Sequence, residues 1–203
     1  MERFVVVAVS TAGAPASLRV LVWRRLRSLG AVYLQQSVCL LPARDPALKE
    51  LRRLVARVRS EGGTARTLIV ELPDQAEYDA LVAEFNAARD VEYGEVVGRT
   101  PALLAEIDME TRRGRATYAE VEESEADLDR FKTWLSKIAA RDYFGAPGGA
   151  AARDAVAACE RALAAFEQAA LSVEAPPGVD ATEDRIDEGR RPRLVAGDRE
   201  PKP

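Results

Sequence analysis

Histidine is absent from the chain, and cysteine occurs only twice, at Cys39 and Cys159. Without histidine, catalysis by Ser-His-Asp or Cys-His groups, zinc sites with histidine ligands and a histidine pH switch are all excluded. The two cysteines lie far apart and form no CxxC motif, so the sequence predicts neither a metal site nor a structural disulfide. These absences exclude most hydrolase classes, and we expect a protein that is not an enzyme and needs no cofactor.

Aromatic residues and long apolar runs are also scarce. Aromatics make up 6% of the chain, so leucine, valine and alanine must form most of the core. No run approaches the ~20 apolar residues that a membrane-spanning helix requires. The apolar run near the N-terminus is too short for a signal peptide, and Glu2 stands where such a peptide carries positive charge. We therefore expect a first strand here, in a cytoplasmic protein.

Charge is plentiful and unevenly distributed. The segment up to Arg66 holds 12 of the 29 Lys/Arg residues but only 4 of the 33 Asp/Glu residues, whereas the remainder holds 17 and 29. A basic first third suits a surface for nucleic acid or an oxyanion. Two other interpretations stay open. The basic part docks onto the acidic part within the chain, or the charges serve solubility alone.

Residues 1–73 predict a small α/β unit. Helix starts are indicated by Pro15 and by Asp45–Pro46, and helix stops by Gly30 and by Gly62–Gly63. The expected elements are a buried central strand over 3–9, a helix over 18–29, two strands within 31–41 with a bend at 35–37, a helix from 45 to 61, and a strand over 64–72. This β-α-β-β-α-β order is that of an α+β, ferredoxin-like fold.

Residues 74–174 predict a helical extension. One amphipathic helix should run from Asp74 towards Val97, and Thr100–Pro101 indicates a new start. Two further helices carry apolar residues at alternating spacings of three and four and are joined by a Gly/Pro turn, so we expect an antiparallel helical hairpin. Their seams consist of Val121, Ser124, Leu128, Phe131, Leu135 and Ile138, and of Val156, Cys159, Leu163, Phe166, Ala170 and Val173. Residues 175–203 are rich in proline, glycine and charge, which is typical of a disordered tail.

Arginine on the outer sides of the first two helices is the main functional signal. Guanidinium groups bind phosphate and other oxyanions through two parallel hydrogen bonds, and Trp23 lies among them. The alternatives are a solvated helix face, or pairing with the acidic segment Glu120–Asp129. The candidate binding residues are Arg19, Arg24, Arg25, Arg27, Lys49, Arg52, Arg53 and Arg57, with a further basic break at Arg112, Arg113 and Arg115.

Weaker signals favour structural roles. The loop Ser10–Ala14 could hold an anion at a helix N-terminus, but it lacks the GxxxxGK pattern. Both cysteines fall in apolar segments and should be core residues. Trp134 lies beside a helix seam, where packing explains it.

Three segments resemble one family. LRVLVWRRLRSLGAVYLQQSVCLLP (18–42), EFNAARDVEYGEVV (84–97) and FKTWLSKIAARDYFGAP (131–147) resemble the N-terminal domain of ChrB, the bacterial chromate-resistance regulator. The first segment is also similar to the ferredoxin-like domain of PaaX-type repressors and, more distantly, to the small nuclease of CRISPR adaptation. That nuclease has an aspartate where this chain has Ser10, so the likeness implies no nuclease activity. Longer ChrB proteins add a second domain linked to chromate sensing, which we do not expect here.

The resemblance and the arginines together lead to three hypotheses. The first is a DNA-binding transcriptional regulator of chromate resistance, acting as a dimer, in which the helix arginines contact phosphates and bases are read around Arg112–Arg115. The second is a protein that binds chromate or another oxyanion directly through Arg24 and Arg25, near the first loop. The third is an interaction module whose helical hairpin docks a separately encoded partner.

Overall fold

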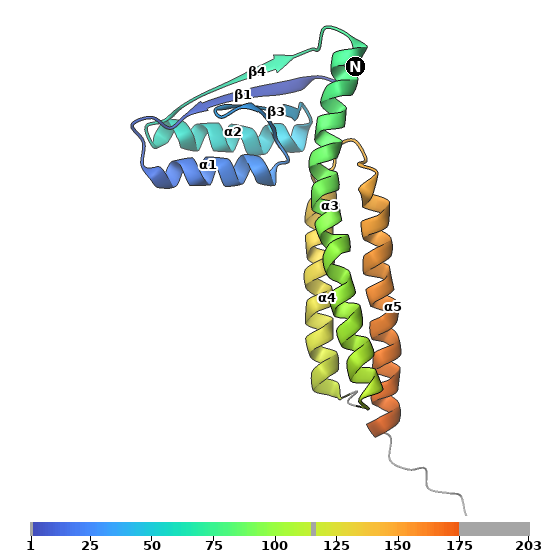
Figure 1. Ribbon diagram of the computed structural model, residues 1–203. Helices are drawn as coiled ribbons and strands as arrows, with labels where there is room; N and C mark the ends of the chain where they lie inside the picture. Colours follow the sequence, from blue (N-terminus) through green and yellow to red (C-terminus); the bar gives the residue numbers. More distant parts are fainter. Residues whose placement is uncertain (1, 115–116, 175–203) are drawn as a thin grey trace, which may run out of the picture.

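A four-stranded antiparallel sheet forms the N-terminal unit of the computed structural model, which describes residues 2–114 and 117–174 (Figure 1). Its strands are β1 (Phe4–Ser10), β2 (Val32–Gln35), β3 (Val38–Pro42) and β4 (Thr64–Val70), in the order β2-β3-β1-β4. β1 is central as predicted, because Val6 lies opposite both Leu40 of β3 and Leu68 of β4. The predicted tail and Arg115 lie outside the described residues.

Helices α1 (Ala16–Ser28) and α2 (Asp45–Ser60) cover one face of the sheet (Figure 1). The core beneath them consists of Val5, Val7, Leu18, Val22, Leu26, Cys39, Leu41, Leu51, Leu54, Val55, Val58 and Ala65. The predicted ferredoxin-like arrangement is thereby confirmed. One detail differs from the predicted start of this helix, in which Asp45 is the N-cap and Pro46 the first helical residue. Arg44 occupies the N-cap of α2 without a capping side-chain bond, and Asp45 is the first helical residue. A carboxylate in the first turn still interacts favourably with the helix dipole.

The opposite face of the sheet is covered only at one end. There Phe4 and Leu40 pack against Leu81 and Phe85, in the first turns of α3 (Gln75–Arg112), and Phe144 closes the cluster. Side chains near the other edge stay in solvent, and Leu68 on β4 is 60% exposed. The helical extension therefore begins on the sheet rather than beside it.

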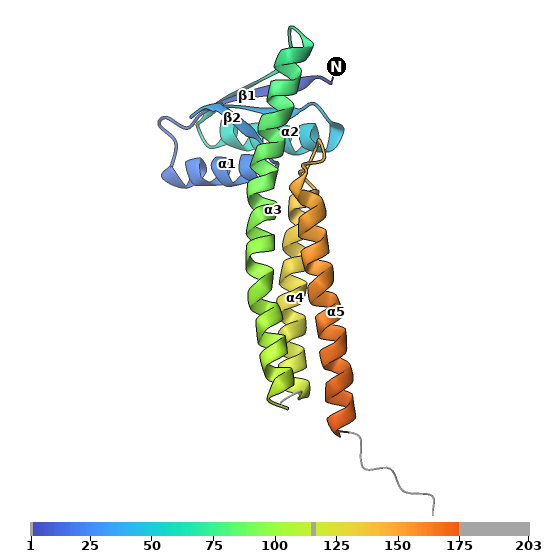
Figure 2. The same cartoon turned by 45° about the vertical axis from the view of Figure 1, so that its right-hand side comes forward.

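Three helices form an elongated bundle that projects away from the sheet, on the same side as α1 and α2 (Figures 1 and 2). α4 (Tyr118–Ala139) and α5 (Gly148–Glu174) form the predicted antiparallel hairpin, and α3 packs against both of them. The predicted seam residues from Val121 to Ile138 and from Val156 to Ala170 are buried or half-buried, Cys159 among them. Within the described ranges, no helix has both the length and the apolar character needed to cross a membrane.

The predicted break at Thr100–Pro101 is wrong, because α3 continues through it as one helix of 38 residues. A proline inside a helix has no N–H for the carbonyl four residues earlier, which here is Val97. The hydroxyl of Thr100 donates a hydrogen bond to that carbonyl oxygen at 3.1 Å. The threonine thus supplies the missing donor, and the helix has no need to end.

A buried polar cluster connects the sheet unit to the bundle, and we call it the joint. Glu92 lies between two arginines, 3.2 Å from Arg89 and 2.6 Å from Arg141. Tyr143 donates a hydrogen bond to the carbonyl oxygen of Leu29 at the end of α1, at 2.7 Å. Arg89 is only 6% exposed, and burial lowers the pKa of its guanidinium. The joint therefore holds the bundle against the end of α1 through charged groups that are largely removed from water.

Within residues 2–114 and 117–174, no docking of the arginine-rich helices onto the acidic start of α4 is observed. Among the described residues, the ion pairs of α4 are formed by Asp127 with Arg130 and by Lys132 with Glu160 of α5. The ion pairs of α1 and α2 are likewise made within the N-terminal unit. The acidic start of α4 lies at the far end of the bundle (Figure 1). The basic surface is consequently left open to an external partner.

Candidate nucleic-acid interface

The basic residues of α1 and α2 lie on the outside because apolar residues occupy the inner side of each helix. In α2 the buried positions are Ala47, Leu51, Leu54, Val55 and Val58, and charged residues fill most of the remaining positions. Eight predicted binding residues are exposed on this layer, and we call them the arginine face. They are Arg19, Arg24, Arg25 and Arg27 on α1, and Lys49, Arg52, Arg53 and Arg57 on α2.

Four of these arginines meet in one groove between the two helices. Arg24 and Arg25 line it from α1, and Arg53 and Arg57 line it from α2. The groove has a volume of about 760 Å³ and is open to solvent. Four guanidinium groups from two elements therefore converge on one surface, which is the arrangement that a run of phosphates requires.

Glu50 holds two of the four arginines in place. It accepts a hydrogen bond from Arg53 at 2.6 Å and pairs with Arg25 across the groove. The hydrogen bond from Arg25 lowers the pKa of Glu50, so the carboxylate stays ionised at neutral pH. The rotamers of both arginines are thereby restrained before any ligand arrives, which reduces the entropy lost on binding.

The other members of the groove and its margins are less constrained. Arg57 pairs at 2.7 Å with Glu61, the C-cap residue of the same helix. Within the residues that the structure describes, Arg24, Lys49 and Arg52 form no ion pair. Glu50 and Glu61 are the only carboxylates that pair with the eight basic residues in this part of the chain, so the arginine face keeps a strong positive excess.

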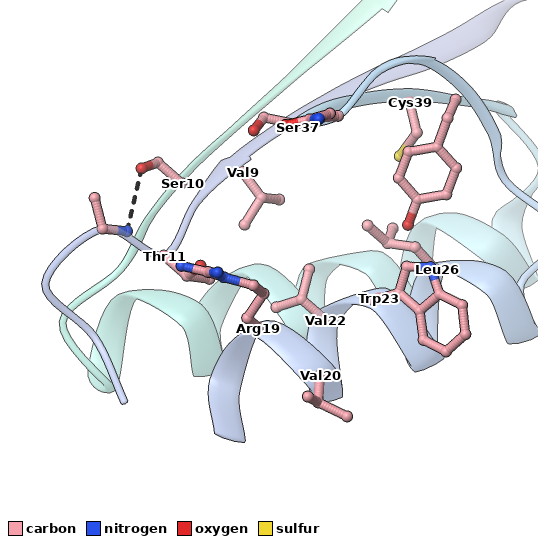
Figure 3. A pocket seen from close by; sticks show the side chains of 13 residues that line it. Val9, Ser10, Thr11, Arg19, Val20, Val22, Trp23, Leu26, Ser37 and Cys39 are labelled. Carbon is pink, nitrogen blue, oxygen red and sulfur yellow. Dashed lines mark hydrogen bonds between the residues drawn. The ribbon is translucent and has the colours of Figure 1, made fainter. Parts of the chain in front are cut away.

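Arg19 lies apart from the groove, in a cavity of about 620 Å³ at the other side of α1 (Figure 3). The cavity is also lined by Ser10 at the end of β1, by Thr11 of the β1–α1 loop and by Ser37 of the β2–β3 turn. Its wall includes Trp23. The guanidinium of Arg27 lies over the indole ring of Trp23, 5.3 Å from the ring centroid, in a cation–π contact. Hydroxyls, one guanidinium and an aromatic wall can receive a small polar anion.

Cys39 contributes to the wall of this cavity but is buried, as the sequence predicted. Burial raises the pKa of its thiol to about 12, so the thiolate is scarce at neutral pH. A neutral buried thiol is a poor nucleophile and a poor metal ligand. Its role is packing, and both cysteines are free thiols.

Two predicted site residues lie far from the arginine face. Arg112 and Arg113 end α3 at the opposite tip of the bundle (Figure 1). Each pairs with a nearby carboxylate, Arg112 with Asp108 at 3.0 Å and Arg113 with Glu110 at 3.1 Å. Because α3 is about 57 Å long at 1.5 Å per residue, these side chains belong to a different surface.

Sequence reasoning missed the residues that organise these sites. Glu50 could have been noticed as the one acidic residue between Asp45 and Arg59, three positions before Arg53. Ser37 carried no signal, because its place in the cavity depends on how the β2–β3 turn packs beside α1. The joint could not be predicted either, since it brings together residues from three segments that are distant in the sequence.

These observations define a class of protein, namely a ferredoxin-like unit with an exposed arginine face and a three-helix bundle. The family model described as "Protein ChrB, N-terminal" matches residues 19–175. The chain therefore belongs to the ChrB N-terminal family, which is related to chromate resistance. The matched region contains both the arginine face and the joint. No curated protein matches the chain.

Proposed function

We propose that this protein is a DNA-binding regulator of chromate resistance that contacts the phosphate backbone through its arginine face. The observation that carries the proposal is the convergence of Arg24, Arg25, Arg53 and Arg57 on one open groove. The protein acts by binding rather than by catalysis, and it works in the cytoplasm, where the bacterial chromosome lies.

Phosphate binding follows from the chemistry of the groove. Guanidinium groups match phosphate oxygens in planar, bidentate geometry, and each neutralised phosphate releases condensed counterions. Glu50 contacts both Arg25 and Arg53 and so holds these two side chains near each other. Such contacts position a duplex but do not by themselves identify its sequence. Base reading by the residues around Arg112 stays a separate prediction.

Salt-dependent binding tests the proposal. The protein should bind a labelled duplex from its own promoter region in fluorescence anisotropy, and the logarithm of affinity should fall linearly with the logarithm of salt concentration. In the double variant Arg24→Ala, Arg53→Ala, affinity should drop and the magnitude of the salt slope should decrease by about 2, or about 1 for each lost contact.

The matched control is the double variant Arg130→Ala, Arg161→Ala, which removes the same charge from exposed positions of α4 and α5. Its affinity should stay close to that of the wild type. The proposal is refuted if no binding occurs at low salt. It is equally refuted if the control loses as much affinity as the groove variant.

A second candidate function is direct binding of chromate or a similar oxyanion, supported by the cavity beside α1. The sequence assigned this role to Arg24 and Arg25, but Arg19 is the arginine that lines the cavity with Ser10 and Thr11. Calorimetry with chromate and with sulfate should show saturable heat that Arg19→Ala abolishes and Arg24→Ala preserves. Equal behaviour of the two variants would contradict this candidate.

A further inference from the structure

Strand β4 is an unusually open edge. It pairs with β1 along its whole length, from Thr64 to Val70, without a shift in register. Edge strands are normally protected by shortness, bulges, proline or charge. The other edge follows that rule, because β2 has four residues and an irregular register between Tyr33 and Gln35. β4 has seven residues, no proline and a single charged residue, Arg66.

β4 exposes one large apolar side chain on each face of the sheet, among exposed polar residues. Leu68 is 60% exposed on the face opposite the helices, and Ile69 is 50% exposed on the helix side. Beside Ile69, a groove of about 480 Å³ runs between β4 and α2, with Leu48 and Val55 among its apolar residues and Arg52 and Arg59 among its charged ones. Arg59 donates a hydrogen bond to the backbone oxygen of Ala65 at 2.8 Å. The open backbone edge thus coincides with incompletely buried apolar surface, and Figure 1 shows β4 as an outer strand.

We infer that β4 pairs antiparallel with β4 of a second copy of this chain, with Thr67 on the two-fold axis. This register is the one that pairs all seven residues of the strand. It places Arg66 opposite Leu68 of the second copy, so like charges do not face each other across the pair. It also places Ala65 opposite Ile69 of the second copy, so that the groove beside α2 continues across the axis.

The pairing explains how one small unit offers enough surface for a duplex, and in this respect it rests on the proposed function. A two-fold axis perpendicular to the sheet keeps both pairs of helices on the same face. The two arginine faces then lie side by side above one eight-stranded sheet. The two bundles, which project on that same side (Figure 2), lie at opposite ends of the paired strands. A symmetric platform of this kind matches a palindromic site.

The oligomeric state of the full chain, measured without DNA, tests the inference. Sedimentation at several concentrations should show a reversible dimer, and Leu68→Lys should raise its dissociation constant at least tenfold. The matched control is Val91→Lys, which alters a residue of α3 that is 67% exposed, and which should leave the dimer intact. A monomeric wild type, or a dimer that Leu68→Lys does not weaken, overturns the inference.

Cross-linking tests the register separately. Thr67 is exposed, whereas both native thiols are buried. In the antiparallel pair, residues facing each other on the axis have Cβ atoms about 4.5–5.5 Å apart, close to disulfide geometry. Mild oxidation of Thr67→Cys should therefore yield a disulfide-linked dimer on non-reducing gels, whereas Leu34→Cys on the β2 edge should not. The opposite result overturns the register. Since no DNA is present, a failure of DNA binding leaves both results unchanged.

Discussion

Replacing Gly30 with alanine should destabilise the protein through two separate effects. Gly30 has φ of +76°, and a side chain in this left-handed region costs about 1–2 kcal/mol. A Cβ atom would also lie 2.8 Å from Nη1 of Arg89 and 3.1 Å from the backbone oxygen of Arg141. Arg89 cannot move aside freely, because it is buried and paired with Glu92. Such overpacking costs about 1–3 kcal/mol more.

Gly62 provides the matched control, because it has φ of +87° but no atom within 4 Å of its Cβ position. Gly62→Ala should therefore lower the free energy of unfolding only through the left-handed backbone conformation, by about 1–2 kcal/mol. Both variants would be unfolded with urea and followed by circular dichroism. If Gly30→Ala loses no more unfolding free energy than Gly62→Ala, the joint does not pack tightly against the end of α1.

Three further outcomes follow from the same structure. Glu92→Gln should lower the free energy of unfolding by about 3 kcal/mol, because it leaves Arg89 buried without its counter-charge; a urea midpoint close to that of the wild type would contradict this. Pro101→Ala should raise the melting temperature, since the new N–H can bond to the Val97 carbonyl and alanine is favoured over proline in a helix by up to about 3 kcal/mol; an unchanged or lower value would argue against it. Burial raises the pKa of Cys39 from 9.0 to about 12, so its neutral form stabilises the fold fully below pH 9 and this contribution is lost as the pH rises from about 9 to about 12. Urea midpoints should fall over that window, and less so in Cys39→Ala.

The α/β unit was predictable because its signals are local. Gly30 and Gly62 mark the helix ends, and both adopt positive φ. The apolar stripe of α2 repeats at helical spacing, and the run from Phe4 to Val9 is apolar without alternation, as in a central strand. Local pattern and tertiary packing agree at these positions, so sequence reasoning succeeds.

The bundle was predictable only in part. The seams of α4 and α5 follow from the spacing of their apolar residues. The prediction of a new helix start at Thr100–Pro101 was wrong. A threonine before a proline is typical of a helix start, yet the same hydroxyl can satisfy the carbonyl that the proline leaves without a donor. Whether the helix restarts or continues at this point depends on packing against α5, where the backbone oxygen of Thr100 lies near Cys159. No local pattern contains that information.

The candidate sites show the same limit. Helical periodicity correctly put the arginines on the outer side of α1 and α2. It could not tell which of them share a groove, because that depends on how the two helices pack on the sheet. Arg24 and Arg53 line the same groove, whereas Arg19 lines the cavity that also contains Ser10, at the end of β1.

The continuity of α3 has a mechanical consequence. One end of this helix packs on the sheet through Leu81 and Phe85, and the other end reaches the tip of the bundle. A stiff rod of about 57 Å acts as a lever, so a tilt of about 5° at the sheet displaces its tip by about 5 Å. A break at Pro101 would absorb such a tilt halfway along. Because the helix does not break, a molecule that binds the tip of the bundle and tilts it also moves the part of α3 that packs on the sheet, next to the end of α1.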